Sequence, residues 1–517
     1  MGKLLPSYKK SVVDEIINGI AGNTSQYYAY ASNPIPYEGV TPSVTSDDYS
    51  TYFVNSWLML FGKRIANSDV LPICNKNFWV SNTQYDKYDN SSNTLYEDNN
   101  YYVVSQPATV GGDYLIYKCI DNANGSLSTV NPSSVGTPTQ ATTFQTSDNY
   151  KWRYITSISS AIYDKFATNQ YIPVYPNTSI QNSANSYSGV EVVMIANGGS
   201  GYSSYGNGFV RGVQNSTVIQ IENNSSENND FYVNNSIYIY NTSSATSQLR
   251  IITDYVSNST GKWVYVDTAV NTQVVTPAVT QYIISPQVYF NTDGDSQPKA
   301  YTTINTTSNS IQSIVILDIG SNISRANAHI ISNTNFGSGA SLRCIVPPPG
   351  GHGFDPVSEL NVQGYAFSFN FANTQGNTIV TSNVVYNKIG LIKNPYVMDS
   401  NGDKGARYSS NTFSQILKAN VNPTFTFTVG ETVTGANSGA KGVVVFANSS
   451  QVYLAGDKTF EDGETVANAA GSEVTTISIQ TLGDIYAKDL KPLYVQNINN
   501  VNRLDNQTES FKLIIKV

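Results

Sequence analysis

Apolar residues recur at helical spacing near the start of the chain. Between Ser7 and Ala21 they stand three or four positions apart, which predicts an amphipathic helix with Ser7 as its N-cap; they are Val12, Val13, Ile16, Ile17 and Ile20. A second helix is predicted from Ser46 to Arg64, with an apolar face made of Trp57, Leu58, Leu60 and Phe61. Asp47 and Asp48 would lie in its first turn, where carboxylates interact favourably with the helix dipole. We expect both apolar faces to pack on a core.

From about residue 73 the pattern changes to short strands. Tyr114–Ile120, Tyr150–Ile158 and Tyr171–Pro176 are rich in aromatic and β-branched residues, which is typical of strands. Stretches of Ser, Asn, Thr and Gly, such as residues 122–148, separate these runs and supply turns. The sequence therefore predicts a mainly β protein with a few helices.

Two glycine patterns mark further β-units. A Gly-Ser-Gly stands near a β-run at Gly199 and again at Gly337, and we interpret these segments as related small sheet units whose glycines supply positive φ. Nearer the C-terminus, Phe-x-x-Gly-Glu-Thr-Val begins at Phe427 and recurs 33 residues later at Phe460. Two such units could pack as one small module over about 423–482, after which Glu509–Val517 would return as a closing strand.

Charge and composition exclude several classes of protein. The net charge is −8 and no cluster of Lys and Arg with interleaved aromatic residues occurs, so specific nucleic-acid binding is not expected. No apolar run approaches the roughly 18 residues of a membrane-spanning helix, and the first ten residues lack the apolar stretch of a signal peptide. The three widely spaced cysteines, Cys74, Cys119 and Cys344, are expected to be reduced and buried in a protein that folds in a cytoplasm.

The segment PPPGGHGFDPVSEL, Pro347–Leu360, raises the question of catalysis because it holds His352, one of two histidines. A catalytic histidine needs an orienting partner, which Asp355 or Glu359 could supply, and a zinc site needs three or four ligands. The other histidine is His329, and no Cys-x-x-Cys occurs. The surrounding glycines instead favour a tight turn or a close backbone approach, so we expect a structural loop.

Three other patterns are weaker evidence for a binding or catalytic site. Asn291–Ser296 and Asp399–Asp403 look like fragments of calcium loops but lack the bidentate glutamate, and they are expected to be ordinary turns. Gly198–Gly208 is rich in glycine but has no Gly-Lys-Ser/Thr, so phosphate binding is not expected. A glycosidase would need a carboxylate pair that sequence alone cannot identify. We predict no catalytic, cofactor-binding or metal-binding residues, no cofactor, and a protein that is not an enzyme.

Five segments, in order along the chain, carry a resemblance. They are DVLPICNKNFWVSNTQYDKYDN (Asp69–Asn90), GDYLIYKCIDN (Gly112–Asn122), SDNYKWRYITSIS followed by TNQYIPVYP (Ser147–Pro176), NKIGLIKNP (Asn387–Pro395) and RLDNQTESFKLIIKV (Arg503–Val517). They resemble the baseplate wedge subunit encoded by gene eight of T-even-like contractile-tailed bacteriophages, for example its Tyr-x-Trp-x-Tyr strand and its Asp-Gln-Thr-Glu ending. The stretch around His352 is similar to one in the marine cyanophage-type versions, where it would be a structural loop.

The resemblance implies a β-sandwich-like subunit of several domains, in which a second domain is inserted into a first domain made from both chain ends. We therefore expect a discontinuous domain of residues 1–72, 366–422 and 483–517, an inserted β domain over 73–190, and two additions over 191–365 and 423–482. It also implies a homodimer that contacts the elongated wedge-core proteins and the ring-forming wedge protein. It implies no catalysis, no nucleic acid and no membrane partner.

The expected function is that of a structural subunit in the tail baseplate of a virion, assembled in the cytoplasm of a host bacterium. The alternative is a tail-fibre or receptor-binding protein that uses tyrosine-rich β-units to recognise host glycans. A trimer would favour this alternative, because fibres are usually threefold.

Overall fold

The computed structural model describes residues 5–39, 41–46, 48–135, 139–202, 206–241, 246–331, 337–372, 384–423, 426–471, 474–490, 492–504 and 507–517. The protein is mainly β, with 46% of its residues in strands and 14% in helices, as the sequence predicted. The chain divides into two compact units, Met1–Ile73 with Gln363–Val517 (unit 1) and Cys74–Val362 (unit 2). Unit 1 is thus made from both chain ends, and unit 2 is one continuous insertion. The finer division into four segments stays a prediction.

Unit 1 opens with the predicted N-terminal helix, whose buried residues include Val13 and Ile20. Its N-cap is Leu5 rather than Ser7, because Pro6 takes the first helical position, where its missing N–H is not needed. The helices of this unit are α1 (Pro6–Ala21), α2 (Tyr49–Trp57) and the 3₁₀ turns η1 (Asn67–Asp69) and η6 (Ala487–Asp489).

The prediction of a helix from Ser46 to Arg64 is wrong in its second half. Asp48 is the N-cap of α2 and accepts from the backbone N–H of Thr51 at 2.7 Å, while Asp47 lies outside the described residues. The helix ends at Trp57, and Leu60 and Phe61 belong to a strand that is buried on both faces. A short apolar run fits a buried strand as well as a helix, and pairing with two neighbouring strands decided between them.

Two antiparallel sheets form the body of unit 1. A five-stranded sheet has the order β26-β2-β1-β23-β33, and β22 pairs with both β3 and the C-terminal strand β34. Strand β34 covers the predicted closing strand Glu509–Val517 except for its last residue. The strands are β1 (Tyr27–Ser32), β2 (Met59–Arg64), β3 (Val70–Asn75), β22 (Gly364–Ala372), β23 (Val384–Lys393), β24 (Tyr396–Met398), β25 (Lys404–Arg407), β26 (Thr412–Ser414), β33 (Pro492–Arg503) and β34 (Thr508–Lys516).

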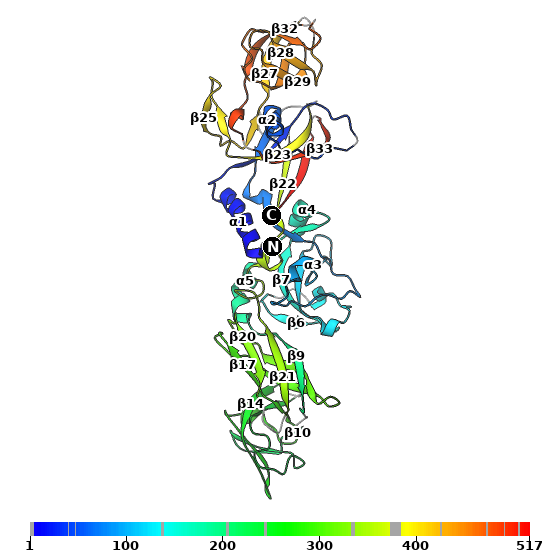
Figure 1. Cartoon of the computed structure of the whole chain (residues 1–517), viewed down its shortest axis with the longest axis vertical. Coiled ribbons are helices and arrows are strands. Elements are labelled where there is room, and N and C mark those ends of the chain that lie inside the picture. The colour runs from blue at the N-terminus through cyan, green and yellow to red at the C-terminus, as the bar shows by residue number, and fades with distance from the viewer. Residues whose placement is uncertain are drawn as a thin grey trace. The chain divides into compact units, whose positions relative to one another are not determined.

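A closed six-stranded barrel lies between β26 and β33 in sequence (Figure 1). Its strands are β27 (Leu417–Pro423), β28 (Thr432–Gly435), β29 (Lys441–Ala447), β30 (Gln451–Gly456), β31 (Thr465–Asn468) and β32 (Val474–Thr481). At its base, Gln415 donates to the carbonyl of Ile485 and accepts from the N–H of Ile485, each at 2.8 Å. This pair of hydrogen bonds joins the chain just before the barrel to the chain just after it.

The Phe-x-x-Gly-Glu-Thr-Val repeat is the internal symmetry of this barrel. Phe427 and Phe460 are both in its core, as are Val433 and Val466. Strands β28 and β31 pair so that Val433 faces Asn468 and Gly435 faces Val466, a register that is unchanged when the two repeats are exchanged. The barrel therefore consists of two three-stranded halves related by an approximate twofold axis.

Unit 2 begins with a four-stranded sheet of order β4-β5-β7-β6, packed around Trp152 and several tyrosines. The predicted strands are confirmed as β5, β7 and a shorter β8. The elements are α3 (Leu95–Asp98), β4 (Tyr102–Ser105), β5 (Tyr114–Asp121), η2 (Ala123–Gly125), η3 (Pro132–Val135), β6 (Thr143–Gln145), β7 (Lys151–Ile158), α4 (Ser160–Phe166), β8 (Tyr171–Pro173), α5 (Thr178–Ala184), η4 (Asn185–Tyr187) and α6 (Pro356–Glu359).

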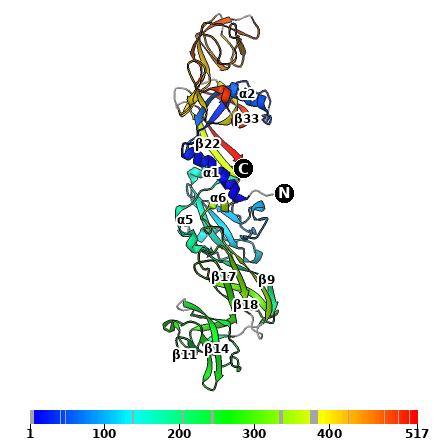
Figure 2. The ribbon, with the colours of Figure 1, turned by 60° about the vertical axis from the view of Figure 1, so that its left-hand side comes forward.

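The middle of the chain adds three two-stranded ribbons and a seven-stranded sheet (Figure 2). The ribbons pair β9 with β21, β17 with β20 and β18 with β19, and they share one core. The sheet has the order β10-β16-β13-β14-β15-β12-β11. The elements are β9 (Val192–Ser200), β10 (Asn207–Phe209), β11 (Gly212–Asn215), β12 (Val218–Ile221), β13 (Asn235–Asn241), β14 (Thr246–Asn258), β15 (Gly261–Val266), η5 (Thr272–Val274), β16 (Gln281–Pro286), β17 (Val288–Thr292), β18 (Lys299–Asn305), β19 (Ser310–Asp318), β20 (Ala326–Ile330) and β21 (Ser338–Ile345).

The two Gly-Ser-Gly segments meet in one of these ribbons, where Ser200 pairs with Ser338. Gly199 and Gly337 both have positive φ, as predicted. A Cβ on Gly199 would lie 2.4 Å from the carbonyl oxygen of Ser338, so the glycines also permit the close backbone approach. The segments are the two strands of one ribbon rather than two separate sheet units.

Candidate functional site

The loop around His352 is a tight glycine turn, as the sequence predicted. Gly350, Gly351 and Gly353 all have φ between 83° and 91°, a conformation that favours glycine. A Cβ on Gly351 would lie 2.4 Å from the carbonyl oxygen of Ala184, so the backbone also passes very close to its neighbour. The turn carries the His352 ring into the interior of unit 2, where it is buried.

His352 joins Lys118 and Glu359 in a buried cluster. Glu359 Oε1 lies 2.7 Å from His352 Nδ1 and 2.7 Å from Lys118 Nζ, and Lys118 Nζ lies 3.1 Å from His352 Nδ1. Glu359 Oε2 accepts from the N–H of Gly353 at 2.6 Å. Asp355, the other carboxylate considered for His352, instead caps α6 by accepting from the N–H of Ser358 at 3.3 Å. Of the two carboxylates considered as partners of His352, the structure therefore brings Glu359 to it.

Aromatic rings enclose this cluster. The Lys118 ammonium lies 3.5 Å from the centroid of the Tyr88 ring, and the same ring meets His352 edge to face at 5.0 Å. The Tyr101 hydroxyl donates to the backbone carbonyl of Glu359 at 2.8 Å. The ammonium is thus held by a carboxylate on one side and by a π-face on the other.

A second buried ion pair lies close enough to act on the first electrostatically. Arg153 on β7 pairs with Glu191, and its Nε donates to Thr143 Oγ1 at 3.0 Å. The positive charge of Arg153 contributes to lowering the pKa of both Lys118 and His352. Two cations and two anions are therefore buried together in unit 2.

The pKa values define the charges of the cluster. Burial, assisted by the Lys118 charge, lowers the pKa of His352 to about 4. Burial also lowers the pKa of Lys118 to about 8, against the opposing effect of Glu359. Burial alone would raise the pKa of Glu359, but the Lys118 charge and the bond to His352 lower it to about 2. At pH 7 the cluster is an ion pair beside a neutral imidazole, and its role is to fasten the glycine turn to β5.

The two calcium-loop fragments are ordinary turns. Asp293 accepts from the N–H groups of Ser324 and Arg325 at 3.0 and 2.8 Å, so it fastens one loop to another. Asp399 accepts from the N–H groups of Asn401 and Asp403 at 2.9 and 2.8 Å within the β24–β25 hairpin. In the part of the chain that the structure describes, no group of three or more His, Cys, Asp or Glu could hold a metal ion.

The glycine-rich segment Gly198–Gly208 covers the end of β9 and the start of β10, and residues 203–205 lie outside the described ones. The three cysteines are free and buried, as predicted. Among the described helices none is long and apolar enough to span a bilayer.

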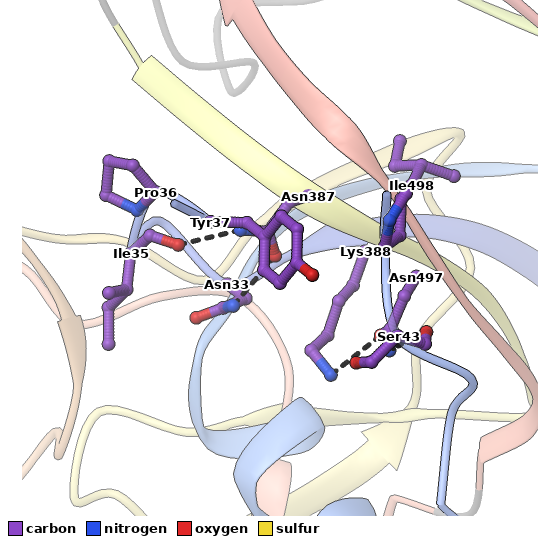
Figure 3. A pocket seen from close by; sticks show the side chains of 10 residues that line it. Asn33, Ile35, Pro36, Tyr37, Ser43, Asn387, Lys388, Asn497 and Ile498 are labelled. Carbon is purple, nitrogen blue, oxygen red and sulfur yellow. Dashed lines mark hydrogen bonds between the residues drawn. The ribbon is translucent and has the colours of Figure 1, made fainter. Parts of the chain in front are cut away.

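An open pocket in unit 1 is the feature that sequence reasoning missed (Figure 3). Its volume is about 260 Å³, and it lies between the segment after β1 and the neighbouring strands β23 and β33. It is lined by Asn33, Ile35, Pro36, Tyr37, Pro42, Ser43, Asn387, Lys388, Asn497 and Ile498. The sequence signal is an Asn-Lys pair, Asn387–Lys388, inside the largely apolar strand β23.

A comparison of the chain with protein-family models gives no match, and a comparison with curated proteins gives none either. The resemblance to a baseplate wedge subunit therefore rests on the five quoted segments.

Proposed function

We propose that this protein is a structural subunit of the baseplate wedge in a contractile-tailed bacteriophage. The observation that carries the proposal is the division of the chain: Cys74–Val362 forms a compact unit inserted into a second unit made from both chain ends. This is the topology that the resemblance implies.

The elements that hold the resembling segments add support. Gly112–Asn122 contains β5, Ser147–Pro176 contains β7 and β8, Asn387–Pro395 contains most of β23, and Arg503–Val517 contains β34. These four segments hold sheet strands, whereas the first, Asp69–Asn90, contains β3 and then continues without a named helix or strand. Most of the matched segments therefore belong to the framework of the two units.

A wedge subunit must bridge its neighbours through broad surfaces, and one region of unit 1 suits that role. Val44, Tyr49 and Phe53, on and just before α2, are 95%, 90% and 66% exposed. Contiguous patches of exposed apolar side chains mark interaction sites, and these three residues, close together in the sequence, are our candidates for one. Wedge contacts must also rearrange when a tail contracts, which requires interfaces with two arrangements of similar free energy.

Light scattering on the purified chain is the first test of the proposal. A dimer would have a mass of about 112 kDa, twice the 56.2 kDa of one chain, and a trimer about 169 kDa. A dimer supports the wedge proposal, and a trimer contradicts it. The second step is to mix the dimer with the other wedge proteins of the same phage and to look for a joint complex in size-exclusion chromatography. Failure of every wedge protein to co-elute would reject the proposal.

A receptor-binding protein remains the second candidate because of one observation on the seven-stranded sheet. Tyr238 and Tyr240 stack on each other with ring centroids 5.2 Å apart, and Tyr301 stacks on Tyr238 at 4.7 Å. Tyr238 and Tyr240 are half-buried on β13, on the face opposite the core residues Ile237 and Ile239. The half-buried Tyr301 extends the stack from β18. If the protein binds host glycans, we expect the purified chain to be a trimer. Replacing Tyr240 and Tyr301 by serine should then abolish its binding to host cells.

A further inference from the structure

The pocket of Figure 3 is held open by hydrogen bonds from asparagine side chains. The segment above it, residues 33–39 and 41–45, is called the strap here. Asn500 on β33 accepts from the N–H of Tyr37 and donates to its carbonyl, each at 2.8 Å. Asn497 on the same strand donates to the carbonyl of Ser43 at 2.8 Å. The strap is therefore fixed at Tyr37 and at Ser43, and the pocket beneath it is preformed.

The floor of the pocket is formed where β23 pairs irregularly with β33. The register between β23 and β33 shifts between Tyr386 and Lys388, as in a β-bulge. Asn387 accepts from Asn33 Nδ2 at 2.7 Å and donates to the carbonyl of Ile35 at 2.7 Å. Because of the shift, the adjacent residues Asn387 and Lys388 both line the pocket, although neighbours in a regular strand point to opposite faces.

Lys388 is the one charged residue among the described residues that line the pocket. Its ammonium donates to Asn497 Oδ1 at 2.9 Å, and no carboxylate within the described ranges forms an ion pair with it. Lys118, Lys262 and Lys404, by contrast, each pair with a carboxylate. Burial lowers the pKa of Lys388, as expected for an ammonium that has lost water without gaining an anion. An ammonium group has three N–H donors, so the Lys388 ammonium can donate to further acceptors besides Asn497.

The remaining walls, apart from Ser43, are largely apolar. Ile35, Pro36, Tyr37, Pro42 and Ile498 surround the amides and the ammonium. A volume of about 260 Å³ is below the roughly 300–1,000 Å³ of pockets that hold drug-sized ligands, so the pocket fits one side chain rather than a cofactor. A glutamate side chain combines the matching features, because its carboxylate suits the ammonium and its methylene groups suit the apolar walls.

We propose that this pocket receives an acidic side chain, most simply a glutamate, presented by a partner protein. Charge complementarity argues for this occupant: the pocket presents an uncompensated cation on a chain whose net charge is −8. The inference does not rest on the proposed function, since it concerns the pocket alone.

The test uses N-acetylglutamate as the probe, observed by saturation-transfer NMR with the full chain. N-acetylglutamine, which keeps the α-carboxylate but has a neutral amide in place of the side-chain carboxylate, is the matched ligand control. We expect saturable transfer to N-acetylglutamate that is at least tenfold weaker for N-acetylglutamine. Equal transfer to the two probes, or none to either, would overturn the proposal. Inorganic phosphate that competes as well as N-acetylglutamate would also overturn it, because the site would then be a general anion site.

Three variants locate the binding. Lys388→Gln keeps a donor for Asn497 but removes the charge, and we expect at least a tenfold loss of affinity. Lys388→Arg should bind within a few-fold of the unchanged protein. Lys393→Gln removes an exposed lysine from the same strand and should have no effect. Full binding by Lys388→Gln would refute the assignment, and the comparison of the two probes on the unchanged protein stands even if that variant fails to fold.

Discussion

Acidification tests the buried cluster most directly, because the chain has only two histidines and one is exposed. The perturbation is His352→Asn. Asparagine places an amide nitrogen near the position of Nδ1, so it can still donate to Glu359, but it cannot take up a proton in this range. The matched control is His329→Asn, on strand β20.

The size of the stability loss on acidification follows from the pKa of His352, which burial lowers from 6.5 to about 4. Between these two values the unfolded chain binds a proton on this histidine and the folded chain does not. Stability therefore falls as the pH falls, and it is fully retained above pH 6.5. At about 1.4 kcal/mol for each pH unit, the loss amounts to about 3 kcal/mol between pH 6.5 and pH 4.

The assay is urea unfolding followed by tryptophan fluorescence at pH values from 7 to 4. Trp152 is fully buried in the same unit and reports on its unfolding. Carboxylates add their own acid dependence, so the quantity compared is the difference between each variant and the unchanged protein. His352→Asn should lose about 3 kcal/mol of this dependence and His329→Asn should keep it. The reasoning is refuted if His352→Asn retains the full dependence.

Four further predictions concern packing and charge. Glu359→Gln leaves a buried lysine without its counter-ion and should destabilise unit 2 by about 3–5 kcal/mol in urea unfolding; a loss below 1 kcal/mol would show that the ion pair is not stabilising. Gly351→Ala places a methyl group 2.4 Å from a backbone oxygen and should lower the melting temperature well below that of Gly402→Ala, which meets nothing within 4 Å and carries only the strain of positive φ, about 1 kcal/mol. Val433→Ala and Val466→Ala occupy equivalent places in the barrel core and should each cost about 2 kcal/mol in calorimetry; a large inequality would contradict the symmetry. Burial raises the pKa of all three cysteine thiols, so a thiol reagent should label none in the native protein and three in denaturant.

Local patterns in the sequence predicted which segments form helices and strands better than they predicted which strands pair with each other. The helix Pro6–Ala21 and the strands β5 and β7 follow from spacing and composition, which are properties of short segments. The apolar run through Phe61 was assigned to a helix because its burial on both faces depends on β1 and β26, and residues of β26 lie some 350 positions away. Pairing at that separation leaves no local signal.

The buried cluster shows the same limit. Lys118 stands inside the strand YLIYKCI and Arg153 inside YKWRYITSI, so each was visible as a charge within an apolar run. Such a charge requires a partner, but nothing in either strand indicates that Glu359 or Glu191 supplies it. The glycines around His352 did predict the turn, because a demand for positive φ is local.

The hydrogen bonds between Gln415 and Ile485 have a consequence for how this chain can change over evolution and in the laboratory. Because the two ends of the barrel segment lie side by side, the other sheets of unit 1 are connected in the same way whether a barrel, a short turn or a foreign domain stands between them. Gln415 and Ile485 thus mark a graft point, at which excision or exchange of about 65 residues leaves the order of the surrounding strands intact.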